Sequence, residues 1–157
     1  TNKMLYNYMY SAFILTMIPN SRIIHCFRNP LDNILSIYKA NFVKGSEYSS
    51  SLSDSANVYI NQEETMTVYK KRYRNKIYDL DYDLLVRNPN DQIRELISWM
   101  GWKWKDSYLS PHLNQRKVLT ASNVQVRSPI NSKSINGWKN YEEMLKPVIE
   151  IITKNQK

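Results

Sequence analysis

The segment from residue 22 to residue 38, RIIHCFRNPLDNILSIY, constrains the fold of this chain more than any other. Its first part, 22–27, is an apolar run of the kind found in strands that are buried in a parallel sheet. Asn29 can cap a helix and Pro30 fits the first helical position. Asp32 adds a negative charge to the first turn, which the helix dipole favours. The segment therefore predicts a buried strand, a sharp turn and a helix.

The predicted helix continues to about residue 42 with one apolar face. That face is formed by side chains at helical spacing, namely Leu31, Ile34, Leu35, Tyr38 and Phe42. Ser36 lies off this face, and Arg28 stands where the strand should end. Because open α/β sheets bind ligands outside the carboxyl ends of their strands, Arg28 and Ser36 should border a crevice that suits an anion. The alternative is that Arg28 forms a surface salt bridge and Ser36 only faces water.

The rest of the chain alternates predicted helices with one more strand. Helices are expected over about 4–18, 53–74 and 88–101, and a strand is expected over 76–82. The first of these helices is apolar nearly all round, so we expect it to be buried. Residues 83–86 should form a turn. The predicted class is α/β.

Composition limits the chemistry that the chain can perform. The net charge of +8 suits an anionic ligand. The one cysteine, Cys26, falls in the predicted buried strand and cannot form an intrachain disulfide, which permits a reducing compartment. No Cys and His cluster has metal-ligand spacing, so we expect no metal. Since neither a signal peptide nor a membrane-spanning stretch is evident, we expect a cytoplasmic location.

Two patterns resemble the sulfotransferases that use 3′-phosphoadenosine 5′-phosphosulfate (PAPS). The pattern R-x-P-x-D-x-x-x-S-x-Y, which begins at Arg28, closely resembles their 3′-phosphate-binding segment. The sequence YDLLVRNPNDQIRELISWMGWKW resembles their pattern of strand, Tyr, acid, Leu, Asn-Pro, helix, Gly and Trp. The resemblance implies that Arg28 and Ser36 hold the 3′-phosphate of the nucleotide and that Tyr82 lies near the adenine. The alternative for Tyr82 is a core tyrosine at a strand end.

Both ends of the chain add to the resemblance. The polar segment 120–141 is typical of a lid over a phosphorylated ligand, and it is similar to the C-terminal loop of tyrosylprotein and related bacterial sulfotransferases. That similarity implies that Ser122 lies near the bridging oxygens and that Lys133 and Ser134 contact the 3′-phosphate. The first four residues resemble the N-K-x-P stretch of the family, which implies that Lys3 contacts the transferring sulfuryl group.

The resemblance also implies a fold, a reaction and a domain organisation. The fold would be a parallel sheet with flanking helices, related to the P-loop nucleotide kinases. Residues 1–157 would form a partial sulfotransferase domain, with a 3′-phosphate-binding strand and helix (22–42), a second strand and helix (76–101), a nucleotide-covering loop (120–141) and a terminal helix (141–154). The enzyme would transfer a sulfuryl group from PAPS to an unknown hydroxyl or amine acceptor and release 3′,5′-bisphosphoadenosine.

In the family, the glycine-rich loop for the 5′-phosphosulfate and the usual catalytic carboxylate precede the residue that matches Lys3. We therefore expect this chain to be the C-terminal part of a domain whose N-terminal part is missing. We also expect it to be inactive alone and able to self-associate through apolar surface.

A non-enzymatic nucleotide- or nucleic-acid-binding module is the rival class. The net charge of +8 and the interleaved aromatic residues support it. The basic residues, however, do not form one stripe, and no RNA- or DNA-binding motif is present. We therefore expect neither a nucleic-acid nor a membrane partner.

Overall fold

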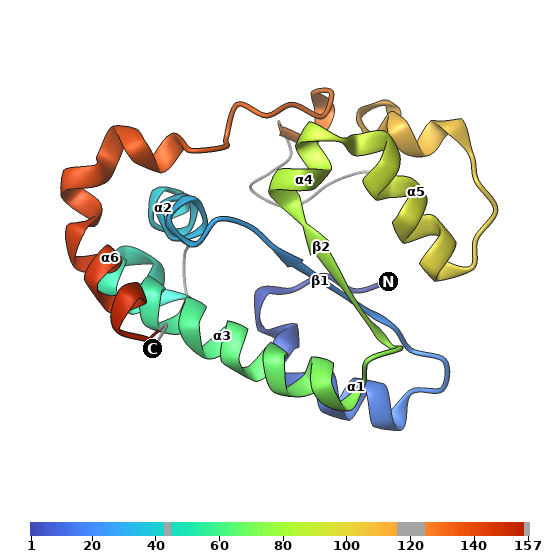
Figure 1. Ribbon diagram of the computed structural model, residues 1–157, viewed down its shortest axis with the longest axis horizontal. Coiled ribbons are helices and arrows are strands. Elements are labelled where there is room, and N and C mark those ends of the chain that lie inside the picture. The colour runs from blue at the N-terminus through green and yellow to red at the C-terminus, as the bar shows by residue number, and fades with distance from the viewer. Residues whose placement is uncertain (43–44, 116–124, 156–157) are drawn as a thin grey trace.

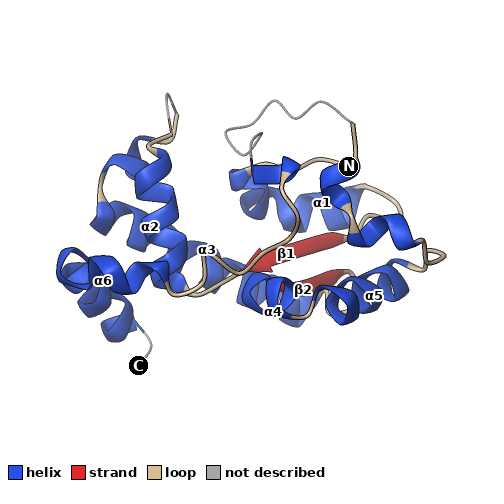
Figure 2. Cartoon of the chain, turned by 90° about the horizontal axis from the view of Figure 1, so that it is seen from above, coloured by secondary structure: helices blue, strands red, loops and turns tan. Residues whose placement is uncertain are grey.

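Two short parallel strands form the centre of the molecule (Figure 1). The computed structural model describes residues 1–42, 45–115 and 125–155. Strand β1 (Ile23–Phe27) pairs along its whole length with β2 (Ile77–Asp81), so that the carboxyl ends of both strands meet at one edge of the sheet. Figure 2 shows the two strands with helices around them. The expected α/β architecture, a small parallel sheet with flanking helices, is confirmed.

The helices form two groups around the strands. The α-helices are α1 (Ser11–Met17), α2 (Pro30–Ala40), α3 (Leu52–Arg72), α4 (Tyr82–Arg87), α5 (Pro89–Met100) and α6 (Glu142–Asn155). Short 3-10 helices cover Leu5–Tyr10, Glu47–Ser50, Asp106–Leu109, Pro111–Leu113, Gln125–Arg127 and Gly137–Tyr141. Helices α2, α3 and α6 pack together, whereas α4 and α5 follow β2 and pack against each other (Figure 1). No helix in the described ranges is long and apolar enough to cross a membrane.

Helix α3 connects two clusters of buried apolar side chains. The first cluster joins α2, α3 and α6 through Ile34, Leu35, Ala56, Leu145, Val148 and Ile152. The second joins α1, α3 and β2 through Leu15, Met66 and Ile77. Because α3 has 21 residues, one helix is long enough to contribute Tyr59 to the first cluster and Met66 to the second. This packing positions α2, and therefore the turn between β1 and α2.

The N-terminal segment differs from its prediction. A buried helix was expected over 4–18, but the structure has a 3-10 helix followed by the short α1, and most of the apolar side chains are exposed. Phe13 and Met17 expose 64% and 62% of their surface, whereas Ser11 and Leu15 are buried. Ser11 and Leu15 lie four residues apart on the one face that packs against Met66 of α3. An apolar surface that surrounds a helix therefore does not guarantee burial when only one side of the helix has a neighbour in the described chain.

Two local predictions are also wrong. Residues 83–86, expected as a turn, belong to α4, because the Asp81 side chain caps this helix by accepting hydrogen bonds from the backbone N–H groups of Asp83 and Leu84. Cys26, expected to be buried, is exposed. Successive side chains of a strand point to opposite faces, and in β1 the face that packs on α3 is that of His25, which is 5% exposed.

Candidate functional site

The turn between β1 and α2 places Arg28 at the carboxyl end of the sheet. The Asn29 side chain accepts hydrogen bonds from the backbone N–H groups of Leu31 (3.0 Å) and Asp32 (3.2 Å), and Pro30 takes the first helical position. The backbone N–H of Asn29 donates to Asp83 Oδ2 on α4 at 3.0 Å. The turn is thus fixed from both sides, and the predicted cap and helix start are confirmed.

The Arg28 guanidinium contacts two distant parts of the chain. Its Nη2 donates to the backbone carbonyl of Ser134 at 2.8 Å, and the group lies over the Tyr82 ring at 5.0 Å from the ring centroid. The hydroxyl groups of Tyr82 and Ser134 are themselves 3.0 Å apart. Three of the residues that were singled out in the sequence therefore meet in space. We call Arg28, Tyr82 and Ser134 the Arg28 cluster.

The Nε donor of the Arg28 guanidinium is buried without a hydrogen-bond partner among the described residues. An unpaired buried N–H is costly, because folding removes its water and supplies no acceptor in return. An anion at the cluster would supply that acceptor, and the dipole of the nearby α2 also favours negative charge at this end. The cluster therefore has the chemistry of an anion site.

Asp32 is the structural residue that sequence reasoning did not identify as part of the site. Its carboxylate is buried and accepts hydrogen bonds from the backbone N–H groups of Asn136 (2.7 Å) and Trp138 (2.9 Å). The same carboxylate lies 3.7 Å from Arg28 Nη2. Asp32 thus fastens the returning segment 134–138 to the start of α2. The sequence carries no signal for this contact, because the groups that bind Asp32 are backbone N–H groups far along the chain.

Within the described residues, three of the predicted site residues, Lys133, Ser36 and Lys3, do not join the cluster. Lys133 precedes Ser134 but its side chain is exposed, and Ser36 is exposed on α2. Lys3 is exposed near the start of the chain. Among the described residues, neither Ser36 nor Lys3 makes a side-chain hydrogen bond or ion pair with the Arg28 cluster. Ser122 lies outside the described residues.

The arrangement of potential metal ligands is a separate feature of the described part of the chain. No group of three or more His, Cys, Asp and Glu side chains there is arranged to hold a metal ion. The Arg28 cluster itself offers a guanidinium, two hydroxyl groups and an aromatic ring.

Comparison with known proteins bears on the family and the fold of the chain. A model of the sulfotransferase family matches residues 1–106, a range that includes Arg28, Ser36 and Tyr82 but not Ser134. A protein of Aquifex aeolicus (strain VF5) described as "Uncharacterized protein" is 35% identical over 159 residues, which cover 99% of this chain and 21% of that protein. The chain thus spans about a fifth of the length of this relative.

A solved structure shares the fold. The sulfotransferase domain from the curacin biosynthetic pathway superposes with a TM-score of 0.65 at 15% sequence identity, covering 85% of this chain and 52% of that domain. This likeness concerns the fold, whereas the family model rests on the sequence and covers more than half of the chain. The chain belongs to the sulfotransferase family.

Proposed function

We propose that the protein transfers a sulfuryl group from PAPS to a hydroxyl or amine acceptor, and that the Arg28 cluster binds the 3′-phosphate of this donor. The observation that carries the proposal is the buried, unpaired Arg28 Nε at the carboxyl end of β1, beside the N-terminus of α2. Membership of the sulfotransferase family favours this enzyme over a non-enzymatic binding module. An arginine is also better suited than a lysine to a phosphate, because its planar fork can form two parallel hydrogen bonds.

Each residue of the cluster has a distinct part in the proposed binding. Arg28 donates Nε, and exchanges the Ser134 carbonyl for a phosphate oxygen at Nη2. Tyr82 supports the guanidinium from one side with its ring. Asp32 keeps segment 134–138 in place, and because both of its oxygens already accept backbone hydrogen bonds, its charge is partly neutralised before the phosphate arrives. Ser36 and Lys133 are proposed as further 3′-phosphate contacts.

The reacting end of the donor needs other groups. Transfer breaks the bond between sulfur and the bridging oxygen, and negative charge develops on the departing phosphate. We propose that Lys3 and Ser122 stabilise that charge, which preorganised cations and hydrogen-bond donors do most effectively. In the full-length protein, Lys3→Ala should then lower kcat with little change in nucleotide affinity. A variant with wild-type kcat would assign Lys3 to the solvated surface.

Nucleotide binding tests the proposed function directly. Calorimetry on the full-length protein should show that 3′,5′-bisphosphoadenosine binds at least about tenfold more tightly than 5′-AMP, since charge-assisted hydrogen bonds contribute roughly 1.5–3 kcal/mol each and about 1.4 kcal/mol corresponds to a factor of ten. The two nucleotides differ only in the 3′-phosphate. Equal affinities would contradict the proposal.

A further inference from the structure

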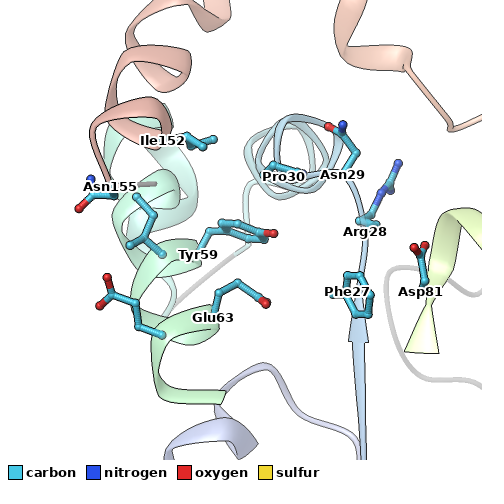
Figure 3. Close-up of a pocket in the computed structure, with 11 residues that line it drawn as sticks. Phe27, Arg28, Asn29, Pro30, Tyr59, Glu63, Asp81, Ile152 and Asn155 are labelled. Atoms are coloured by element: carbon cyan, nitrogen blue, oxygen red, sulfur yellow. The ribbon is translucent and has the colours of Figure 1, made fainter. Parts of the chain in front are cut away.

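A pocket lies at each end of the two strands. The pocket at the carboxyl end is lined by Arg28 together with the carboxylates of Glu63 and Asp81 (Figure 3), and it adjoins the Arg28 cluster. A second pocket, of about 550 Å³, is lined by Arg22 and Lys76, the residues that immediately precede β1 and β2. We call it the amino-end pocket. The five residues of β1, which rise about 3.3 Å each, separate Arg22 from Arg28, so the two pockets are distinct sites.

The amino-end pocket has a positive charge that no carboxylate in its lining offsets. Arg22 and Lys76 line it, whereas no Asp or Glu does so in the part of the chain that the structure describes. Arg22 Nη1 donates to the backbone carbonyl of Trp99, and Lys76 Nζ donates to the backbone carbonyl of Leu15 at 3.0 Å. No ion pair within the described ranges includes either cation. Because a carbonyl carries no net charge, both cations can still attract an anion.

Both cations are held in position by the surrounding chain. The Arg22 guanidinium lies over the Trp99 ring, 5.1 Å from the ring centroid. The backbone carbonyl of Lys76 accepts a hydrogen bond from the N–H of Ile23 at 2.8 Å, and the N–H of Lys76 donates to the carbonyl of Tyr73 at 2.8 Å. A guanidinium has five N–H donors and an ammonium three, so each can bind an oxyanion and keep its carbonyl partner. Groups that are fixed before binding lose less conformational freedom on binding, which favours affinity.

The other lining residues add an apolar surface and neutral polar groups. Trp102 lines the pocket and exposes 52% of its surface. It follows Gly101, whose left-handed conformation ends α5, and its backbone N–H donates to the carbonyl of Ile97 at 3.0 Å. An exposed indole offers a flat apolar face, against which a second aromatic ring can pack favourably. Asn20 and Asn75 also line the pocket and contribute amide groups that can donate hydrogen bonds.

We propose that the amino-end pocket is a second binding site, which takes a small organic anion with a sulfate or phosphate group on a flat apolar body. Arg22 and Lys76 bind the oxyanion, and Trp102 packs against the body. The volume of about 550 Å³ falls in the range of about 300–1,000 Å³ that is usual for small-molecule sites. Binding at this pocket requires no PAPS, so the inference goes beyond the proposed function.

The test compares three probes in the full-length protein by calorimetry: 2-naphthyl sulfate, 2-naphthyl phosphate and uncharged 2-naphthol. Each ester should bind at least about tenfold more tightly than 2-naphthol, because only the esters accept charge-assisted hydrogen bonds from Arg22 and Lys76. The affinity of the esters should also fall as the salt concentration rises. Tighter binding of one ester identifies the natural ligand as a sulfate or as a phosphate, and either preference supports the site.

Two variants locate the binding of the esters. Lys76→Met removes one cation and should weaken both esters at least about tenfold. Trp102→Ala removes a half-exposed side chain, which leaves the fold intact, and should weaken both esters at least about threefold. The matched control is Lys154→Met, which makes the same chemical change at an exposed position on α6 and should retain wild-type affinity.

Ester affinities no greater than that of 2-naphthol would overturn the amino-end pocket as an anion site. Wild-type ester affinities in both Lys76→Met and Trp102→Ala would overturn it as well. The proposed function fails separately, through equal affinities for 3′,5′-bisphosphoadenosine and 5′-AMP. Nucleotide titrations that are repeated in Lys76→Met keep the two claims apart, because this variant removes the contribution of the amino-end pocket to nucleotide binding.

Discussion

The chain contains nearly the same five residues twice, with different outcomes. Segment 28–32 reads RNPLD and segment 87–91 reads RNPND. Both start a helix with Pro at the first position, α2 in one case and α5 in the other (Figure 1). Asp32 is buried and binds two backbone N–H groups, whereas Asp91 is exposed. Nearly the same local sequence thus starts a helix at a proline in both places but has an unequal environment.

The elements around each segment explain the difference. Segment 28–32 follows β1 at the edge where parallel strands end, and segment 134–138 returns there to contact Arg28 and Asp32. Segment 87–91 follows the short α4, and Arg87 is exposed. Asn29 caps its helix with two hydrogen bonds, whereas Asn88 makes no side-chain cap. Segment 28–32 therefore differs from segment 87–91 because it follows strand β1 and contacts the distant segment 134–138.

The largest change in the free energy of unfolding should come from removing the buried carboxylate of Asp32. Asp32→Ala leaves the backbone N–H groups of Asn136 and Trp138 without their acceptor and removes the neighbour of Arg28, so we expect a loss of about 3 kcal/mol in the free energy of unfolding. Asp91→Ala, the matched change in the second segment, should cost less than about 1 kcal/mol. Urea unfolding followed by tryptophan fluorescence measures both, and equal losses would remove the distinction between the segments.

Smaller changes in the free energy of unfolding are expected when Asn29 and Asn88 are replaced. Asn29→Ala removes a side-chain cap that accepts two hydrogen bonds and should destabilise the protein by about 1 kcal/mol. Asn88→Ala should change the free energy of unfolding by no more than about 0.5 kcal/mol, because this side chain makes no cap. The same urea titration measures the free energy of unfolding of both variants. A greater loss for Asn88→Ala would show that the caps differ from those in the structure.

The third prediction concerns Tyr59, which packs beneath α2 and so supports segment 28–32 but not segment 87–91. Tyr59 packs against the cluster that contains Ile34 and Leu35 of α2, and burial, together with the charge of Glu63, raises the pKa of Tyr59 to about 12. Because the folded pKa of Tyr59 lies above the ordinary value of 10.0, the folded state holds this proton more tightly. The associated stability is complete below pH 10 and is lost as the pH rises toward about 12.

Tyr59→Phe isolates this contribution. The variant should lose less stability than the wild type between neutral pH and pH 11, with both proteins measured by urea unfolding at each pH. Tyr108→Phe serves as the control, since Tyr108 lies in the 3-10 helix Asp106–Leu109 and packs in neither buried cluster. Parallel alkaline losses in the wild type and Tyr59→Phe would contradict the raised pKa.

The sequence predicted local structure better than burial. Pro30, Asn29 and Gly101 signal chain geometry by themselves, and the structure has α2 and α5 beginning and ending near these residues, with Gly101 in the left-handed conformation at a φ of 71°. Burial depends on neighbours that no local pattern names. Met17 and Cys26 are apolar or weakly polar and are nevertheless exposed, because the elements that carry them are covered on one side only in the described chain.

Some residues of the candidate site could be located from the sequence and one could not. The spacing of segment 28–38 located Arg28, and the resemblance to sulfotransferases pointed to Tyr82 and Ser134, which the structure places around it. Asp32 was interpreted only as a charge at a helix start. Its contacts with Asn136 and Trp138 span more than 100 positions in the sequence and use backbone N–H groups, which every residue type except proline provides. Side-chain identity therefore gave no indication of this contact.

The measurement that tests the account most directly is the nucleotide preference of two matched arginine variants in the full-length protein. Arg28→Ala should remove most of the preference for 3′,5′-bisphosphoadenosine over 5′-AMP, because the 3′-phosphate loses its charged hydrogen-bond donors. Arg87→Ala makes the same change in the second segment and should leave the preference intact. Calorimetry with both nucleotides gives the two ratios. An unchanged preference in Arg28→Ala, or an equal loss in Arg87→Ala, would contradict the assignment of the 3′-phosphate to the Arg28 cluster.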